Sequence, residues 1–330
     1  MDSPAVLYAL RWLIHDTFRQ TFTSRVFWIL LSLSGLCVVF CLGVSVEGGA
    51  VRAENELVGK DGKLLAESRE SPGRLNLLFG AFPIEFTRSA DAEVQFLLNV
   101  FGSMIAGFAG VLMALVWTAG FMPESLHPSA ASVMLAKPIP RWLLLMGKFC
   151  GVVCFIALHA AIFFAGTWFA LGLRTNAWSH PEYLLGIPLL TFHFAVVYSF
   201  SVMLAVISRS TMACVVGGVL FWIACYAVNY GRHFAVVYGD LNPGAEALPG
   251  FTVFLSEAGY WLLPKPVDFT MMLEKSLNLS AGMVTLTSQQ PFARVIEKDL
   301  FHPFLSICTS CVFPIFSIWA SASHLSKTDY

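Results

Sequence analysis

Charge is what this sequence has least of. Only 12% of its 330 residues are Asp, Glu, Lys or Arg, whereas 57% are hydrophobic. Soluble domains carry roughly 25% charged residues, because charge keeps their surface in water. A chain with half of that share cannot cover a globule of this size with polar surface. The composition therefore excludes a soluble protein and indicates lipid as the natural solvent.

Several chemical signatures are also missing. The chain has no G-x-x-x-x-G-K-[ST] loop to cradle nucleotide phosphates, no H-E-x-x-H of metalloproteases and no G-x-S-x-G of serine hydrolases. Its net charge is −1 and it has no basic run, so nothing in it favours binding to nucleic acid. We therefore expect a chain that is not an enzyme, with no catalytic residue, bound cofactor or metal.

Cysteines in polar loops are absent as well, which argues against a secreted disulfide scaffold. We interpret the cysteines as thiols buried in the membrane, where cysteine behaves as a small apolar residue. Cys308 and Cys311 form a C-x-x-C, so thiol exchange or copper handling stays an open alternative. All eight lie in apolar stretches: Cys37, Cys41, Cys150, Cys154, Cys214, Cys225, Cys308 and Cys311.

Six stretches without Asp, Glu, Lys or Arg are long enough to cross the hydrocarbon core, which takes about 20 residues. They predict an all-α membrane protein with a single transmembrane domain over residues 1–330. The expected spans are about residues 26–46, 94–121, 149–173, 183–208, 211–231 and 303–323.

A separate helix is predicted ahead of the first span, over residues 4–24. Apolar residues recur there at three- and four-residue steps, while Arg11, Asp16 and Arg19 take the other side. This spacing is typical of an amphipathic helix. Because a span follows directly, we expect the helix to lie along the membrane interface.

Basic residues near the ends of spans set the orientation of a polytopic protein. With the N-terminus inside, these residues gather on the cytoplasmic side, and we expect Lys148 to snorkel to the interface. We therefore expect both termini in the cytoplasm and integration into the plasma (inner) membrane of a bacterium. The cytoplasmic set is Arg11, Arg19, Arg25, Lys137, Arg141, Lys148, Arg209 and Lys327.

Two long loops, residues 47–93 and 232–302, are extracytoplasmic in this topology. In the first, Lys60-Asp61-Gly62-Lys63 predicts the turn of a small hairpin. In the second, Pro266 followed by Val267–Leu277 predicts a short amphipathic helix that lies on the outer face or dips into the membrane.

The segment between the second and third spans, residues 122–148, is the most informative. Glu124 stands where a helix leaves the membrane, and Pro128 suits the first turn of a new helix. Pro138 and Pro140 end that helix, because neither can donate a backbone hydrogen bond. The pattern predicts a short rigid helix between two spans, either a plain connector or a device for passing force.

Three elements of this segment resemble the second cytoplasmic region of ABC-2 type permeases, the membrane subunits of one class of ABC transporters. They are Glu124, Leu135-Ala136-Lys137-Pro138-Ile139-Pro140-Arg141 and Lys148-Phe149-Cys150-Gly151. The Gly-Thr pair of the family is absent, because Ser129-Ala130-Ala131-Ser132 stands there. Six spans after an interfacial helix, and the stretch Tyr260–Lys265 with its Leu-Pro-Lys, are similar to the family as well.

The resemblance implies that Glu124–Arg141 is a coupling segment that seats in a separate ABC ATPase subunit. Two permeases, as a homodimer or heterodimer, would pair with two ATPases, and ATP with Mg²⁺ would bind to those partners. The expected function is export of an unidentified substrate, with membrane lipid around the spans and no nucleic acid partner. The residues expected to contact the ATPase are Glu124, Ser129, Val133, Leu135, Lys137, Pro138, Pro140 and Arg141.

Few polar side chains lie well inside the spans. Asn99, His159 and His193 are the candidates for a substrate path, because intramembrane polar groups often mark one. Each is also compatible with a packed side chain that only hydrogen-bonds between helices. Two other functions stay open: a membrane thiol oxidoreductase that uses Cys308 and Cys311, and a non-catalytic scaffold held by its outer loops.

Overall fold

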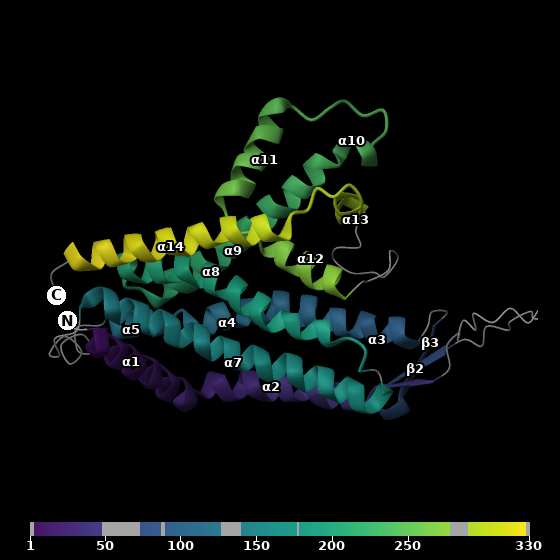
Figure 1. The fold of residues 1–330 in the computed structure, drawn as a ribbon, viewed down its shortest axis with the longest axis horizontal. Helices are drawn as coiled ribbons and strands as arrows, with labels where there is room; N and C mark the ends of the chain where they lie inside the picture. Colours follow the sequence, from purple (N-terminus) through teal and green to yellow (C-terminus); the bar gives the residue numbers. More distant parts are fainter. Residues whose placement is uncertain are drawn as a thin grey trace, which may run out of the picture.

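The computed structural model describes residues 3–47, 73–86, 90–126, 140–176, 178–277 and 290–327. Within these ranges, six helices are long and apolar enough to cross a membrane, which confirms the predicted all-α six-span class. They run side by side in one elongated bundle (Figure 1). The six are Arg25–Leu42, Asp91–Ser125, Arg141–Thr175, Pro181–Ser208, Thr211–Val236 and Pro303–Lys327.

A helix ahead of the spans, α1 (Ser3–Thr23), fits the predicted N-terminal helix. Ser24 is extended and separates it from α2 (Arg25–Leu42), the first span. The face of α1 that carries Leu13, Thr17 and Thr21 is buried, and it packs on α7 (Arg141–Thr175).

The second span is not a uniform α-helix. It runs through α3 (Ala90–Asn99), the π-helix η2 (Val100–Gly110), α4 (Val111–Thr118) and the short α5 (Phe121–Ser125). π-Helices are rare and concentrate at functional sites, because their wider turn interrupts normal packing. The apolar sequence predicts the span but gives no sign of this widened middle.

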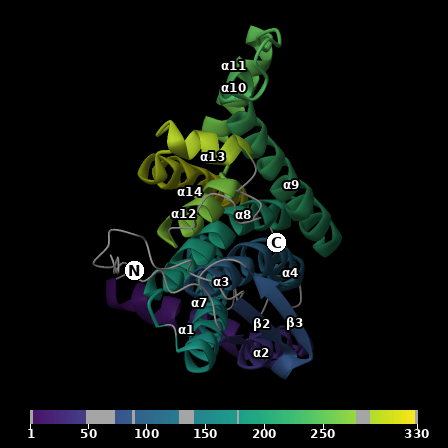
Figure 2. The same ribbon diagram turned by 90° about the vertical axis from the view of Figure 1, so that its right-hand side faces the viewer.

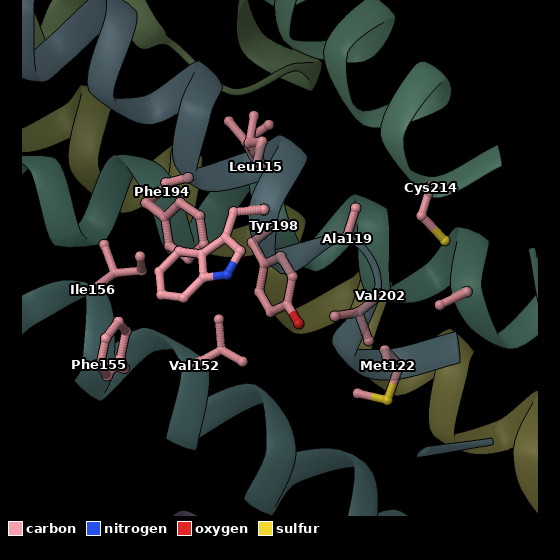
Figure 3. Packing of buried hydrophobic residues seen from close by; sticks show 14 of the residues in the cluster. Leu115, Ala119, Met122, Val152, Phe155, Ile156, Phe194, Tyr198, Val202 and Cys214 are labelled. Atoms are coloured by element: carbon pink, nitrogen blue, oxygen red, sulfur yellow. The ribbon is translucent and has the colours of Figure 1, made fainter. Parts of the chain in front are cut away.

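The core forms around α8 (Gly186–Ser208), which follows the 3₁₀ turn η3 (Pro181–Leu185). It packs against α7, α9 (Thr211–Val236) and α14 (Pro303–Lys327). Figure 3 shows Phe194 and Tyr198 of α8 close together, with Phe155 of α7 in the same buried apolar cluster. A rigid centre of this kind holds the surrounding helices in register.

Four short helices are described between the last two spans, over residues 238–277 and 290–297. They are α10 (Tyr238–Leu241), α11 (Gly250–Leu262), α12 (Pro266–Ser276) and α13 (Gln290–Glu297). Figures 1 and 2 both show α10 and α11 projecting from the bundle, whereas α12 lies close to the spans. α12 packs against α8, α9, η2 and α14, so the helix predicted over Val267–Leu277 is part of the bundle.

A small antiparallel sheet sits at the end of the bundle away from both termini (Figure 1). Its order is β1 (Ser45–Glu47), β2 (Gly73–Leu77) and β3 (Phe82–Phe86). The connection from β2 to β3 runs through η1 (Leu78–Gly80), where Leu78, Phe79 and Gly80 all have positive φ. The turn predicted at Lys60–Lys63 lies outside the described residues.

Candidate functional site

The described flanks of the predicted coupling segment lie at the end of the bundle where both termini lie (Figure 1). Glu124 is exposed in α5, and Pro140 precedes the first turn of α7. The other residues predicted to contact an ATPase lie outside the described residues: Ser129, Val133, Leu135, Lys137 and Pro138.

Arg141 joins the start of α7 to the end of the last span. Its Nη1 donates a hydrogen bond to the carbonyl oxygen of Leu325, at 3.1 Å. Leu325 lies in the last turn of α14, where a helix leaves carbonyl groups without internal partners and favours a cation. The predicted segment is therefore bound directly to the sixth span.

Lys148 joins α7 to α1. Its Nζ donates to Asp16 Oδ2 at 2.8 Å and to Gln20 Oε1 at 3.1 Å, and the residue is only 2% exposed. The expectation that Lys148 snorkels to the interface is wrong, because the carboxylate of Asp16 balances its charge inside the protein. The helix of the third span begins at Arg141, ahead of the predicted start at residue 149, and therefore includes the charged Lys148.

Two glycines let α1 approach α7 closely. A Cβ at Gly147 would lie 2.5 Å from Leu13 Cδ1, and one at Gly151 would lie 2.7 Å from Thr17 Oγ1. The Lys-x-x-Gly element formed by Lys148 and Gly151 therefore has a physical basis. The lysine fixes α1 by charge, and the glycine leaves the space in which α1 lies.

A network of polar side chains surrounds Asp268, which is completely buried at the start of α12. It accepts hydrogen bonds from His233 Nε2 at 2.7 Å, Asn229 Nδ2 at 2.8 Å and Tyr260 Oη at 2.7 Å. The Oγ of Ser306 donates to the same carboxylate. These donors come from α9, α11 and α14, so one carboxylate holds α12 to three other helices.

Asn229 also caps α12. Its Oδ1 accepts the backbone N–H groups of Val267 at 2.8 Å and Asp268 at 3.2 Å. Amides of a first helical turn have no partner within their own helix, and the Lys265 side chain does not cap them. A residue of the fifth span thus completes a helix of the following loop.

Charge in this network is well compensated. Burial alone would raise the pKa of Asp268, but hydrogen bonds and the charge of His233 hold that pKa below its ordinary value. Burial lowers the pKa of Lys265 to about 8. The ammonium of Lys265 donates to Thr309 Oγ1 at 2.8 Å and lies 4.7 Å from the ring centre of Tyr260.

A third polar contact joins α12 to the second span. Asn99 Nδ2 donates to Glu274 Oε1 at 3.3 Å, and Ser103 Oγ donates to Asn99 Oδ1 at 2.7 Å. Burial raises the pKa of Glu274 to about 7, more than the hydrogen bond from Asn99 lowers it. Asn99 directly precedes the π-helix η2, so this carboxyl lies against the irregular part of that span.

The two candidate histidines also have partners. His193 is buried, accepts a hydrogen bond from Trp222 Nε1 at 3.3 Å and stacks on Phe269 of α12. His159 Nε2 lies 3.1 Å from Ser34 Oγ and borders a largely apolar cavity of about 90 Å³ between α2, η2 and α7. The interhelical hydrogen bonds are as expected, and the substrate-path role stays a prediction.

Sequence reasoning missed the carboxylates of Asp268 and Glu274, because a search for uncharged spans assigns charged segments to loops. Spacing does contain a signal. Asn229 and His233 are four residues apart at the end of the fifth span and share one helix face. A buried serine face on the sixth span is a second signal, formed by Ser306, Ser310, Ser317 and Ser321.

Hydrogen bonds and ion pairs join the polar side chains described above. The described ranges contain no group of three or more His, Cys, Asp or Glu side chains placed to hold a metal. All eight cysteines have free thiols. The polar groups thus connect helices at both ends of the bundle, an arrangement suited to moving helices together.

Comparison with known proteins agrees with this architecture. The family model described as "ABC-2 family transporter protein" matches residues 11–238, which is more than half of the chain. That range runs from α1 to the start of α10 and includes the contacts of Lys148 with α1. It also includes Arg141 and Asn99, whereas their partners Leu325 and Glu274 lie beyond it. No curated protein matches the chain. The chain therefore belongs to the ABC-2 family of transporter proteins and is an integral membrane permease of an ABC transporter.

Proposed function

We propose that this permease is the membrane subunit of an exporter driven by ATP hydrolysis on a separate ATPase subunit. The sequence has no phosphate-binding loop of its own, which favours a separate chain for the nucleotide. ATP and Mg²⁺ bind to that partner, and this chain needs no resident cofactor. Two permeases, identical or related, pair with two ATPases.

The observation that supports a coupling role for Glu124–Arg141 is that the C-terminal end of this segment contacts other helices. Arg141 contacts the last turn of α14, and Lys148, two turns further along α7, holds α1. A displacement of the segment is therefore passed to α1, α7 and α14 together. Glu124 is exposed at the same end, so its carboxylate is accessible to a partner.

We infer that this end of the bundle faces the cytoplasm of a bacterium, with the spans in the inner membrane. Basic side chains gather there, as expected for the cytoplasmic side, and ATP is available there. Both termini then lie in the cytoplasm. The described basic residues are Arg11, Arg19, Arg25, Arg141, Lys148, Arg209 and Lys327.

The test is ATP hydrolysis by the permease co-expressed with its ATPase. Glu124→Ala and Arg141→Ala are expected to reduce permease-stimulated hydrolysis about ten-fold or more while membrane insertion stays normal. Glu182→Ala is the matched control, because Glu182 is an exposed carboxylate in η3, beyond the other end of α7. If a chain with residues 124–141 scrambled still forms a fully active complex, the coupling role is wrong.

Asn99, His159 and His193 remain the proposed path residues. Replacing each by Ala should change transport of candidate substrates into inside-out vesicles without loss of the assembled complex. Normal export by all three variants would exclude them from the path. Accumulation of substrate outside inside-out vesicles instead of within them would contradict export.

A further inference from the structure

One face of α1 is turned away from the bundle and carries a row of basic side chains. Leu13 and Thr17 lie against Gly147 and Gly151, and Lys148 fixes the rotation of the helix through Asp16. The same contacts therefore fix which residues of α1 point away from the bundle. Arg11, His15 and Arg19 occupy it at four-residue steps, all exposed, about 6 Å apart along the helix axis.

These basic groups keep their charge available for a ligand. Among the described residues, neither Arg11 nor Arg19 forms an ion pair. The acid nearest in sequence, Asp16, is bound to Lys148 at 2.8 Å. The row therefore has a net positive charge.

The basic row borders an apolar groove. Ile14, Phe18 and Phe22 line it together with the row itself. A ligand that fits must be anionic at one place and apolar beside it. An acidic protein surface offers the first property without the second, and so does a free inorganic anion.

The groove also lies close to the start of the first span. Only Ser24 separates the end of α1 from the first span, which begins at Arg25. Trp28, in the first turn of that span, is exposed and donates its indole N–H to the carbonyl oxygen of Phe22 at 3.2 Å. Exposed tryptophan is typical of the membrane interface. Figure 1 shows α1 on the outside of α7, at the end where both termini lie.

We propose that α1 carries a binding site for an anionic phospholipid, with the headgroup phosphate on Arg11, His15 and Arg19 and an acyl chain over Phe18 and Phe22. Guanidinium groups suit this role because they bind phosphate oxygens in pairs. Lipid bound here holds α1 in place at the base of α7. The site is independent of the exported substrate and of the ATPase.

The experiment titrates the purified full-length permease, without ATPase, with phosphatidylglycerol or with phosphatidylcholine of the same acyl chains. Native mass spectrometry measures bound lipid, and thermal unfolding measures its effect. We expect phosphatidylglycerol to bind more tightly. The preference should fall about five-fold for Arg11→Gln or Arg19→Gln and roughly 30-fold for both together, since each basic residue near an anionic surface contributes similarly.

Control variants separate charge from fold. Arg174→Gln removes an exposed arginine at the other end of α7 and should leave the preference unchanged. Arg11→Lys with Arg19→Lys keeps the charge and should retain most of it. If the double Gln variant fails to fold, the single variants give the same test.

Three outcomes would overturn the lipid site. The first is equal binding of the two lipids by the wild type. The second is an unchanged preference in R11Q/R19Q, which would also leave the row free to contact an acidic partner protein. The third is equal stabilisation by inorganic phosphate, which would mean that the acyl chain contributes nothing.

Discussion

Two neighbouring helices of the same loop behave in opposite ways. α11 (Gly250–Leu262) is apolar, yet it is mostly exposed, with Phe251 at 74% and Phe254 at 68%. α12 (Pro266–Ser276) carries Asp268 and Glu274, yet both of these carboxylates are buried. In a soluble protein the burial of the two helices would be reversed.

This contrast is as expected for a loop that lies against lipid. Lipid accepts an exposed Phe254 at no cost, because lipid tails are as apolar as its ring. A carboxylate such as Asp268 must find its partners within the protein. In this bundle the polar groups, rather than the apolar ones, therefore indicate which loop helix belongs to the core.

The largest expected effect comes from removing the carboxylate that holds α12. Asp268→Ala leaves His233, Asn229, Tyr260 and Ser306 without their common acceptor. We expect a loss of about 3–5 kcal/mol in the free energy of unfolding, as for other broken buried pairs. Denaturant unfolding in mixed micelles measures it.

A surface acid of the same loop is the control for that change. Asp240 pairs with Lys298 at an exposed position. Asp240→Ala should cost less than about 1 kcal/mol. Similar losses from the two variants would mean that α12 is no more firmly held than the loop surface.

The second effect depends on pH. The pKa of Glu274 is about 7 in the folded protein, against an ordinary value of 4.5. The folded state thus binds an extra proton between these values, so its contribution to stability is complete below about pH 4.5. It declines as the pH rises through 7, by at most about 3 kcal/mol.

Unfolding free energies measured between pH 4 and 8 check this slope. Glu274→Gln should remove most of it, whereas Glu182→Gln, at an exposed site, should leave it unchanged. An identical slope in wild type and Glu274→Gln would show that the carboxyl titrates in an ordinary environment and that α12 is solvated there.

The third effect tests the contact between α12 and the π-helix. A Cβ at Gly102 would lie 2.7 Å from Leu273 Cδ2 and 3.1 Å from Tyr183 Cε2. Gly102→Ala should therefore cost about 1 kcal/mol, since the Leu273 side chain must shift within a packed core. Thermal unfolding of the purified protein measures the loss.

Gly35→Ala is the matched control, because no atom lies within 4 Å of the Cβ that it adds in α2. Alanine favours a helix over glycine, so this variant should be neutral or gain up to about 1 kcal/mol. Destabilisation by Gly35→Ala but not by Gly102→Ala would contradict the packing described for η2 and α12.

The smallest expected effect is on α11. Phe254→Ala removes a large aromatic ring that is 68% exposed, so it leaves no cavity. The unfolding free energy should stay within about 0.5 kcal/mol of wild type. A loss as large as that of Asp268→Ala would mean that α11 packs on another protein surface rather than lipid.

The sequence predicted the six spans and the N-terminal helix, because a long uncharged run or a three- and four-residue apolar repeat has few alternatives. It could not place α12 in the bundle, since burial of Asp268 depends on residues far away in the chain, such as His233 and Ser306. The partner of Lys148 was missed for the same reason. A single charge near a span end fits both a snorkelling side chain and an ion pair.

The candidate site also contains residues that a local sequence pattern predicts and contacts that it does not predict. Glu124 and Arg141 were predicted as ATPase contacts because the segment between two spans resembles a local motif of the family, and this role stays a prediction. The contact of Arg141 with Leu325 joins residues that are 184 positions apart, and no local pattern encodes it. The π-helix also escaped prediction, because the glycines of Val100–Gly110 are equally typical of an ordinary close-packed span.

The close packing of α1 on Gly147 and Gly151 of α7 also has a consequence for the synthesis and membrane insertion of the protein. Leu13 leaves the ribosome well before Gly147, by roughly ten seconds at about 5–20 residues per second. During that time α7 is not yet present to cover the apolar side of α1, and the membrane interface can cover it instead. We therefore expect α1 to lie at the membrane interface early in synthesis and to pack on α7 once the third span is inserted.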